Sequence, residues 1–482
     1  MQRNSLWVAV ALALAAPLAQ ADDLKALREE VAQLKKSYED RIAALEKRLA
    51  DAEARPATTA ASAPVVAGTG QVGAGSAFNP QISLILDGVY FHDNKGGGST
   101  EMYEHIDGIN HSHEHEGHAH GELERGFNLR ETELAFSATV SPHFDATALM
   151  TVSRDGDVEL EEAYFDTRSL PYGLKVRGGK FLSGIGYLNA QHPHQWDFVD
   201  QNLPYRTLLG EHGLVDTGLR LSWLPKTGNW FTQLGVEFLQ GNEQTFASSG
   251  EEIADVRADG APLAGTAAGE LAGKKSGPRL TTVFAKFGPD LGINHALQFG
   301  GWYARSSQHQ EVHDHSAENP VALVTALQGK GKAWGLDAVY KYDAGRYGGQ
   351  GNVKLVGEYL RLNKDLKVAF HEGGTLVGTP FDFVQDGFVV QGTYGFLPYW
   401  QAGVRYDATG LTNKVDMPSG SPWKGNKSDR WTFALTRHID HFSLLRLQAS
   451  RGNLWVEGAK ENANQIFLQY QHSLGAHGAH SF

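Results

Sequence analysis

The sequence predicts an all-β transmembrane barrel of about 16 antiparallel strands, preceded by an α-helical coiled coil. Residues 465–474 alternate apolar and polar side chains, as a barrel strand does, and the chain ends on Phe482. Short turns alternate with long polar segments between the candidate strands, which is the arrangement of periplasmic turns and extracellular loops in outer-membrane barrels. Past residue 21, no apolar run is long enough to form a transmembrane helix.

Residues 1–21 have the pattern of a secretory signal. Arg3 supplies the positive charge, an apolar run extends from Leu6 to Leu18, and Ala19-Gln20-Ala21 is a small-x-small cleavage site. The alternative, a retained membrane anchor, is disfavoured because the apolar run is short and rich in alanine. We therefore expect the chain to be exported.

The composition limits the chemistry that an exported chain of this kind can carry. It contains no cysteine, which excludes disulfides and thiolate metal sites, so any metal ligands must be His, Asp or Glu. The formal net charge of −12 argues against nucleic acid as a partner and favours cations or neutral solutes. We expect that no cofactor is required and that outer-membrane lipid surrounds the barrel.

Residues 22–55 predict a periplasmic coiled coil, because their apolar side chains recur at intervals of three and four with charged residues between them. The seam consists of Leu24, Leu27, Val31, Leu34, Tyr38, Ile42, Leu45 and Leu49. Self-association is expected, with a trimer favoured, although this mixed seam does not fix the number of chains. The alternative is a lone amphipathic helix on the barrel or the membrane. Residues 56–77, rich in small uncharged side chains, predict a flexible linker.

Residues 78–482 are assigned to the barrel. The predicted strands are 81–91, 127–140, 144–153, 158–168, 174–184, 214–224, 229–239, 279–288, 295–305, 333–343, 351–362, 385–395, 399–407, 428–438, 443–451 and 464–474. The predicted long loops are 92–126, 185–213, 240–278, 306–332, 363–384, 408–427 and 452–463. An even strand number returns the C-terminus to the periplasm. A soluble β-sandwich array or propeller would not explain the short and long alternation or the terminal Phe.

The first long loop is rich in histidine and carboxylates, which favours capture of a divalent metal ion, with Zn²⁺ first and Cu²⁺ or Ni²⁺ as alternatives. Its histidines are His105, His111, His113, His115, His118 and His120. A later long loop adds His309, His313 and His315. The plainer interpretation is a solvated loop with incidental affinity for metals.

The loop at 185–213 contains aromatic residues and two prolines, so it is too apolar to extend freely into water. We expect it to fold into the lumen and to set the constriction of the pore. Its predicted pore-lining residues are His192, His194, Asp197, Asp200, Arg206, Glu211 and His212. His192 and His194 could also contact a metal, but a structural His-Pro-His turn fits the sequence at least as well.

Several charged residues alternate with apolar neighbours and are therefore predicted to face the lumen. They are Glu131, Glu133, Glu159, Glu161, Arg177 and Lys180. Glu161 and Glu162 are adjacent, so strict alternation places them on opposite faces of the strand. No nucleophile elbow, phosphate-binding glycine loop or acid/base pair is evident, and we expect the protein not to be an enzyme.

Three blocks of sequence resemble a family of proteobacterial outer-membrane proteins often labelled zinc-regulated outer-membrane receptors, sometimes with "TonB-dependent" added. They are residues 127–150, 158–198 and 473–482. The layout of a coiled coil before a barrel also resembles phosphate-selective porins, which are sixteen-stranded trimers. The resemblance implies uptake of zinc or other divalent metals across the outer membrane. A terminal Phe such as Phe482 is what the barrel-assembly machinery of bacteria typically recognises.

The sequence thus favours a porin-type channel that captures divalent metal ions, most of all zinc, with its histidine-rich extracellular loop. Three alternatives stay open. The first is a general or anion-selective trimeric porin with an incidental histidine loop. The second is a TonB-dependent zinc receptor, and the third is a structural protein that anchors the envelope.

Overall fold

The computed structural model describes most of the chain from Gln81 to Gly475. The described ranges are 81–103, 105–108, 123–152, 156–263, 270–314, 316, 321–374, 376–416 and 422–475. The predicted signal (1–21), coiled coil (22–55) and linker (56–77) lie outside the described residues, as does Phe482. Those predictions therefore stay predictions.

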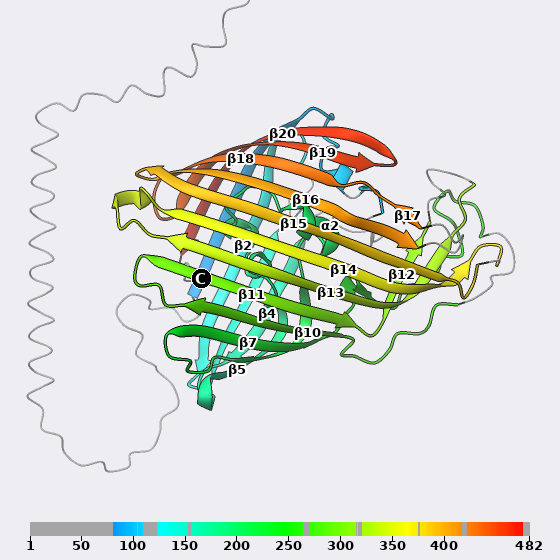
Figure 1. Ribbon diagram of the computed structural model, residues 1–482, viewed down its shortest axis with the longest axis horizontal. Helices are drawn as coiled ribbons and strands as arrows, with labels where there is room; N and C mark the ends of the chain where they lie inside the picture. Colours follow the sequence, from blue (N-terminus) through cyan, green and yellow to red (C-terminus); the bar gives the residue numbers. More distant parts are fainter. Residues whose placement is uncertain are drawn as a thin grey trace, which may run out of the picture. The chain divides into compact units, whose positions relative to one another are not determined.

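The described residues form a sheet of long antiparallel strands with few helical turns (Figure 1). In chain order, the first strands are β1 (Gln81–Asp93), β2 (Gly126–Ser141), β3 (Phe144–Val152), β4 (Val158–Thr167), β5 (Leu174–Leu182), β6 (Val215–Trp223), β7 (Trp230–Leu239), the pair β8 (Glu243–Gln244) and β9 (Ala247–Ser248), and β10 (Leu280–Pro289). They are followed by β11 (His295–Ser306), β12 (His309–His313), β13 (Thr325–Tyr342), β14 (Val353–His371), β15 (Pro380–Leu397), β16 (Trp400–Asp416), β17 (Trp423–Lys424), β18 (Ser428–His438), β19 (Ser443–Val456) and β20 (Ala459–Gly475). The helical turns are η2 (Glu101–Tyr103), η3 (Pro171–Gly173), η4 (Leu188–Ala190), η5 (Pro193–Gln195), α2 (Leu203–Leu208) and η6 (Tyr347–Gly349).

The sheet closes on itself. Strand β1 pairs with β2 on one side and with the last strand, β20, on the other, so that Phe91 lies opposite both Gly126 and Phe467. Within the described residues, the main sheet has 18 strands, of which β12 and β17 are short segments beside β13 and β16. The others form a closed antiparallel barrel of 16 strands. The predicted fold class is confirmed.

The two faces of the barrel wall differ in polarity, as a membrane requires. On β20, Leu468 and Tyr470 are exposed on the outer face, whereas Gln469 and Gln471 are buried on the inner face. Outward-facing aromatic rings pair across strands, as Tyr406 and Trp431 do with their ring centroids 4.7 Å apart. A closed barrel with an apolar outer band satisfies its backbone hydrogen bonds in lipid. The protein is therefore a bacterial outer-membrane barrel.

The described part of the chain contains no helix long and apolar enough to cross a membrane.

The strands on one side of the barrel extend further than the sequence pattern predicts. Strands β13 to β16 have 17 to 19 residues, and they include large parts of the predicted loops 306–332, 363–384 and 408–427. Beyond Trp334 the outward face becomes polar, with an ion pair between Lys332 and Asp365. Because both faces are wet above the lipid, the apolar and polar alternation disappears there although the strand pairing continues.

A second predicted loop, 452–463, is in fact a tight hairpin between β19 and β20. Its turn residues Glu457 and Gly458 both have positive φ, at 51° and 77°. Two successive residues of this kind match the right-handed twist of paired strands, and glycine at the second position makes the turn easy to form. The prediction of a long loop was wrong because this polar strand end has little alternation.

We predict that Leu447→Arg destabilises the barrel by about 2–4 kcal/mol, the cost of an arginine on the lipid face near the bilayer midplane. Leu447 is 50% exposed between the outward-facing Leu435 and Leu468. A matched control is Leu411→Arg, since Leu411 is also 50% exposed but lies beyond the Tyr406–Trp431 pair, next to polar residues. Urea unfolding in lipid vesicles measures both, and equal costs would contradict the position assigned to the lipid band.

Candidate functional site

The segment between β5 and β6, residues 183–214, turns into the lumen instead of forming an external loop. Its short helical pieces follow local rules. Pro193 is the first residue of η5 and Pro204 the second residue of α2, positions in the first helical turn where a missing N–H and a fixed φ are tolerated. The Asn202 side chain caps α2 by accepting the Tyr205 N–H at 3.0 Å. In Figure 1, α2 is seen within the barrel.

One side of this inner segment is held by apolar packing around a buried carboxylate. Ile185 and Leu208 are fully buried in a cluster with the barrel residue Phe284. Glu358 on β14 accepts the backbone N–H groups of Tyr187 and Leu188 at 2.8 and 2.6 Å. It also accepts the Tyr205 hydroxyl at 2.6 Å. The Glu358 side chain thereby fixes two parts of the segment, at Tyr187 and at Tyr205, to the barrel wall.

The other side of the segment is held by buried arginines. Arg405 on β16 and Arg430 on β18 both form ion pairs with Asp200 of the inner segment, and both also pair with Asp407. Arg446 on β19 donates to the Trp196 carbonyl at 3.0 Å. Burial alone would raise the pKa of the Asp200 carboxyl, but Arg405 and Arg430 outweigh it and hold that pKa below its usual range. Charge pairing therefore fixes the segment to this wall.

The wall formed by β2 to β4 is rich in carboxylates and contacts the same segment through histidines. Met150 pairs with Leu160 and Leu149 with Glu162, so Glu161 is the extra residue of a β-bulge. The bulge turns both Glu161 and Glu162 toward His192, at 3.2 Å from its Nδ1 and 3.0 Å from its Nε2. The expectation that Glu162 faces away from Glu161 was therefore wrong, because strict alternation fails at a bulge.

The neighbouring histidine contacts another carboxylate of this wall. The Nδ1 atom of His194 lies 2.9 Å from Glu133, and the rings of His192 and His194 are stacked with centroids 5.9 Å apart. Burial alone would lower the pKa of His192, but its contacts with Glu161 and Glu162 raise that pKa well above the usual range. This side of the lumen is thus an alternation of carboxylate and imidazole groups.

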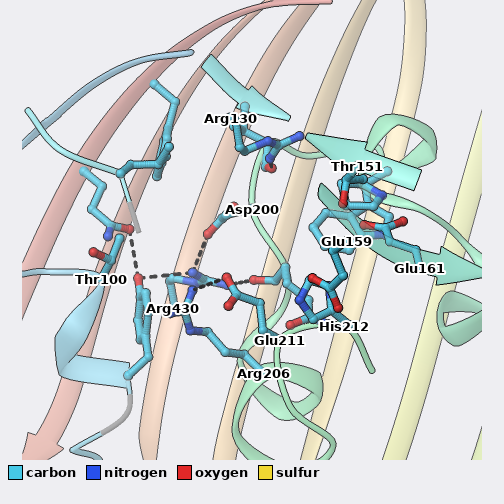
Figure 2. A pocket seen from close by; sticks show the side chains of 18 of the residues that line it. Thr100, Arg130, Thr151, Glu159, Glu161, Asp200, Arg206, Glu211, His212 and Arg430 are labelled. Atoms are coloured by element: carbon cyan, nitrogen blue, oxygen red, sulfur yellow. Dashed lines mark hydrogen bonds and ion pairs between the residues drawn. The ribbon is translucent and has the colours of Figure 1, made fainter. Parts of the chain in front are cut away.

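Cavities lie above and below the inner segment, where "above" means toward the long connections. The first upper cavity, of about 100 Å³, is lined by residues that include Glu159, Glu161, Glu211 and His212. In Figure 2, Glu159 and Glu161 lie on one side of this cavity, whereas Glu211 lies beside Arg206 and Arg430. A second upper cavity, of about 150 Å³, shares those four residues and adds Glu162 and His192. These volumes hold several water molecules.

The lower cavity, of about 320 Å³, has a different character. It lies beside the short turn between β18 and β19 and is lined by Lys341, Lys354 and Arg446, together with Asp197 and Asp440. Trp196 lines this cavity and both upper cavities, so its indole lies where they meet. The second upper cavity is therefore predominantly acidic, the first combines carboxylates with Arg130, Arg206 and Arg430, and the lower cavity has more cations than carboxylates.

The structure brings the sequence-predicted pore residues together on one inward segment. His192 and His194 contact the acidic wall, and Asp200 contacts the arginine wall. Asp197 pairs with Lys354 at 2.8 Å, and Arg206 lies 3.9 Å from Glu211. Glu211 and His212 line the upper cavities. Their role as the constriction of a pore stays a prediction that this placement favours.

The predicted metal ligands are only partly described. His111, His113, His115, His118, His120 and His315 lie outside the described residues. His105 is described, just after Tyr103, whose ring packs with Ile106 in a buried cluster. The role of these histidines in binding metal stays a prediction.

His309 and His313 lie in a buried ion-pair cluster on β12. Both contact Glu311, at 2.9 and 3.1 Å, and Lys364 reaches the same carboxylate at 2.9 Å. The Nδ1 atom of His309 also accepts the Ser248 N–H at 3.1 Å. Burial, as the largest cause, lowers the pKa of His309. A metal ion bound to His309 would have to displace the Ser248 or the Glu311 contact.

Sequence reasoning missed the residues of the wall that receive the segment. Glu358, Arg405, Arg430 and Arg446 all come from strands whose positions were predicted correctly. In each strand the residue occupies one of the alternate positions whose side chains face the lumen, and this alternation can be read from the sequence. Alternation does not, however, say which inward residues meet the segment.

Comparisons with known proteins identify one relative and several remote structural neighbours. No model of a protein family matches the chain. An Aquifex aeolicus protein described as "Uncharacterized protein" is 34% identical, over 84% of this chain and 80% of its own length.

The similar solved structures include the trimer form of OmpT from Vibrio cholerae (TM-score 0.47, 10% identity, covering 82% of this chain and 99% of that one). The channel DcaP of Acinetobacter baumannii is another (0.46, 11%, covering 82% and 97%). A third is an anion-selective porin from Comamonas acidovorans (0.45, 11%, covering 82% and 99%). At such scores the fold assignment rests on the strand pairing of the chain itself.

We predict that Arg430→Met loosens the inner segment, because it leaves Asp200 and Asp407 as buried carboxylates with one guanidinium fewer. Breaking a buried pair in this way costs about 3–5 kcal/mol. Urea unfolding should show the loss, and single-channel recordings should show a larger and noisier conductance. The control is Arg451→Met, since Arg451 on β19 is exposed. Unchanged stability and conductance in Arg430→Met would contradict the role given to this arginine.

We also predict that the inner segment loosens in acid. The pKa of Asp200 is lower in the folded protein than in the unfolded chain, so the carboxylate stabilises the fold above about pH 4 and loses that effect as the pH falls further. Hydrogen exchange of residues 197–205, corrected for intrinsic rates, should be faster at pH 3 than at pH 7. In Asp200→Asn the exchange should be fast at both pH values. Equal protection of the native segment at the two pH values would refute this account.

Proposed function

Because this chain belongs to the same family as the Aquifex aeolicus protein and folds as an outer-membrane barrel, we propose that it is a porin-type channel for divalent metal ions. Zinc is the favoured ion, as cargo and not as a resident cofactor. The proposal includes that the protein is not an enzyme. It also includes a trimeric assembly through the coiled-coil seam and recognition of Phe482 by the barrel-assembly machinery.

The observation that carries this proposal is the lining of the upper cavities. The second of them is predominantly acidic, because Glu159, Glu161, Glu162 and Glu211 line it with Lys180 as a cation, whereas Arg130, Arg206 and Arg430 also line the first. Clefts lined by one sign of charge concentrate the opposite ion, and low-dielectric walls strengthen the effect. Carboxylate and imidazole groups are also the ligands that zinc accepts in the absence of cysteine. An entrance of this kind favours divalent cations over anions.

The position of the histidine-rich stretch agrees with that proposal. Tyr103 and Leu123 lie on either side of it in the chain, and both line the first upper cavity. The Tyr103 hydroxyl donates to Gln465 at 2.8 Å, which fixes this flank to β20. The two flanks of the stretch are thus at the channel entrance, and we propose that metal released from its imidazoles enters the upper cavities there.

A second candidate function is supported by the lower cavity. Lys341, Lys354 and Arg446 line it, and a row of cations at this level would favour anions. Two acidic residues, Asp197 and Asp440, line the same cavity and offset part of that charge. A general or anion-selective porin is therefore the alternative that a transport experiment has to exclude.

We predict zinc influx into vesicles that contain the purified protein and an encapsulated zinc-sensitive dye. Influx should exceed that of protein-free vesicles, and zinc should pass more readily than phosphate or chloride. Substitution of the loop histidines should slow influx at micromolar zinc but not at millimolar zinc, because the loop acts by raising the local ion concentration. The variant is His111→Asn, His113→Asn, His115→Asn, His118→Asn and His120→Asn combined. Preference for anions, or influx equal to that of empty vesicles, would refute the proposal.

A further inference from the structure

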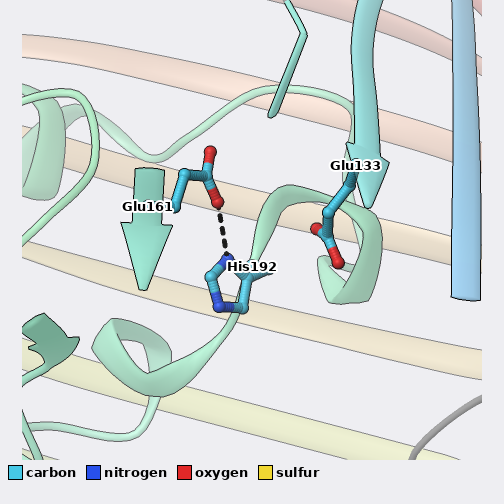
Figure 3. Close-up of side chains that lie close together, drawn as sticks. All are labelled: Glu133, Glu161 and His192. Atoms are coloured by element: carbon cyan, nitrogen blue, oxygen red, sulfur yellow. Dashed lines mark ion pairs between the residues drawn. The ribbon is translucent and has the colours of Figure 1, made fainter. Parts of the chain in front are cut away.

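Three potential metal ligands meet inside the barrel, from three elements far apart in the chain. One ligand atom each from Glu133 on β2, Glu161 on β4 and His192 of the inner segment lie within 4.8 Å of one another (Figure 3). We infer that Glu133, Glu161 and His192 form a binding site for a divalent transition-metal ion in the wall of the lumen. The inference deepens the proposed channel function and rests on it for the ion's route of entry.

The separation of these atoms suits a small ion. Zinc bonds of 2.0–2.1 Å at tetrahedral angles put two ligand atoms roughly 3.3 Å apart. The Nδ1 atom of His192 and the Oε2 atom of Glu161 are already 3.2 Å apart. Glu133 has to approach by a small side-chain rotation, since its ligand atom lies within 4.8 Å of the other two. Three protein ligands then leave a fourth position for water, as in sites that exchange their ion or ligand.

Two further residues orient the ligands from behind. The Nε2 atom of His192 lies 3.0 Å from Glu162, so an N–H there donates to that carboxylate while Nδ1 faces Glu161. A histidine held by a carboxylate on its second nitrogen is the usual outer-shell arrangement of metal-bound imidazole. Glu162 is itself fixed, because it accepts the Leu182 N–H at 2.7 Å. His194 packs beside Glu133, with its Nδ1 atom 2.9 Å from that carboxylate.

The burial of these groups makes a cation favourable. Glu133 and Glu162 are 3% and 6% exposed, and each of the three carboxylates lies within 3.2 Å of a histidine nitrogen. Gathering three carboxylates in a region of low dielectric constant is costly unless positive charge compensates it. A divalent ion between Glu133, Glu161 and His192 replaces the proton on Nδ1 of His192, because a ligating imidazole has to be neutral, and supplies two positive charges in its place.

An ion can reach the site from the water-filled side of the lumen. Glu161 lines both upper cavities, and His192 lines the second of them. Glu159 and Glu211 line the same cavities nearer the entrance, so an ion passes from one carboxylate region to the next.

The ligand types indicate the class of ion. Imidazole nitrogen together with two carboxylates suits zinc and other divalent first-row transition metals. Calcium prefers six to eight oxygen ligands, and magnesium keeps several waters in a strict octahedron. A site with one histidine and three protein ligands therefore discriminates against both of these abundant ions.

The experiment titrates Co²⁺, a spectroscopic substitute for zinc, into the full-length protein in detergent. The background carries the five loop substitutions His111→Asn, His113→Asn, His115→Asn, His118→Asn and His120→Asn, so that the loop does not contribute. Co²⁺ should bind with visible absorption bands, and zinc should displace it. Glu161→Gln and His192→Gln should each weaken binding by more than about tenfold, and Glu162→Gln by about 10–100-fold.

The matched control is Glu211→Gln, which removes the same charge from the same cavities but lies outside the ligand set. This substitution should change the Co²⁺ affinity less than about threefold, because it alters only the overall electrostatic potential of the cavity. Heat-modifiable migration on gels verifies that each variant is a folded barrel. If Glu161→Gln binds Co²⁺ as its parent does, or if Glu211→Gln is equally impaired, there is no specific site and the inference is wrong.

The outcome is separable from that of the channel proposal. Zinc influx into vesicles without any loss of Co²⁺ affinity in the variants would leave the channel function standing and remove the site. Specific Co²⁺ binding without zinc influx would leave the site standing and remove the transport function.

Discussion

The pairing of β1 with β20 is the constraint on which the rest of this structure depends. In lipid, every backbone N–H and C=O needs a partner within the protein, and an open sheet edge would leave a whole row without one. Closure satisfies that row, and it also creates a wet interior insulated from the membrane. Only in such an interior can a buried residue such as Arg430 be tolerated, beside the opposite charge of Asp407.

The inner segment divides this interior into two electrostatic regions. On one wall, arginines from β16, β18 and β19 face the segment, and Asp200 and Asp407 neutralise part of their charge. On a nearby part of the wall, beyond β20 and β1, strands β2 and β4 present carboxylates to its histidines. The segment therefore joins two walls of opposite charge, and its own residues carry the complementary charge at each contact.

Much of the barrel could be predicted from the sequence, because lipid enforces a simple rule. Where one face must be apolar and the other polar, alternation appears, and the strand from Ser428 to His438 was predicted to the residue. Beyond the lipid the rule lapses, so the upper parts of β14 and β15 were assigned to a loop. The entry of residues 185–213 into the lumen was expected from their aromatic and proline content. Their contact with Glu358 or Arg430 depends on closure in three dimensions, which no local pattern records.

The bulge at Glu161 has a consequence for how such a wall can change over time. A regular strand sets same-face side chains nearly 7 Å apart, too far for two of them to grip one imidazole. The additional residue of the bulge lets both Glu161 and Glu162 contact the imidazole of His192. The strand pairing on either side of the bulge is regular. Deletion of one residue there would remove one of the two carboxylate contacts with His192, and the neighbouring strands could keep their pairing. The contacts of His192 with this wall can thus be changed by one insertion or deletion while the barrel stays closed.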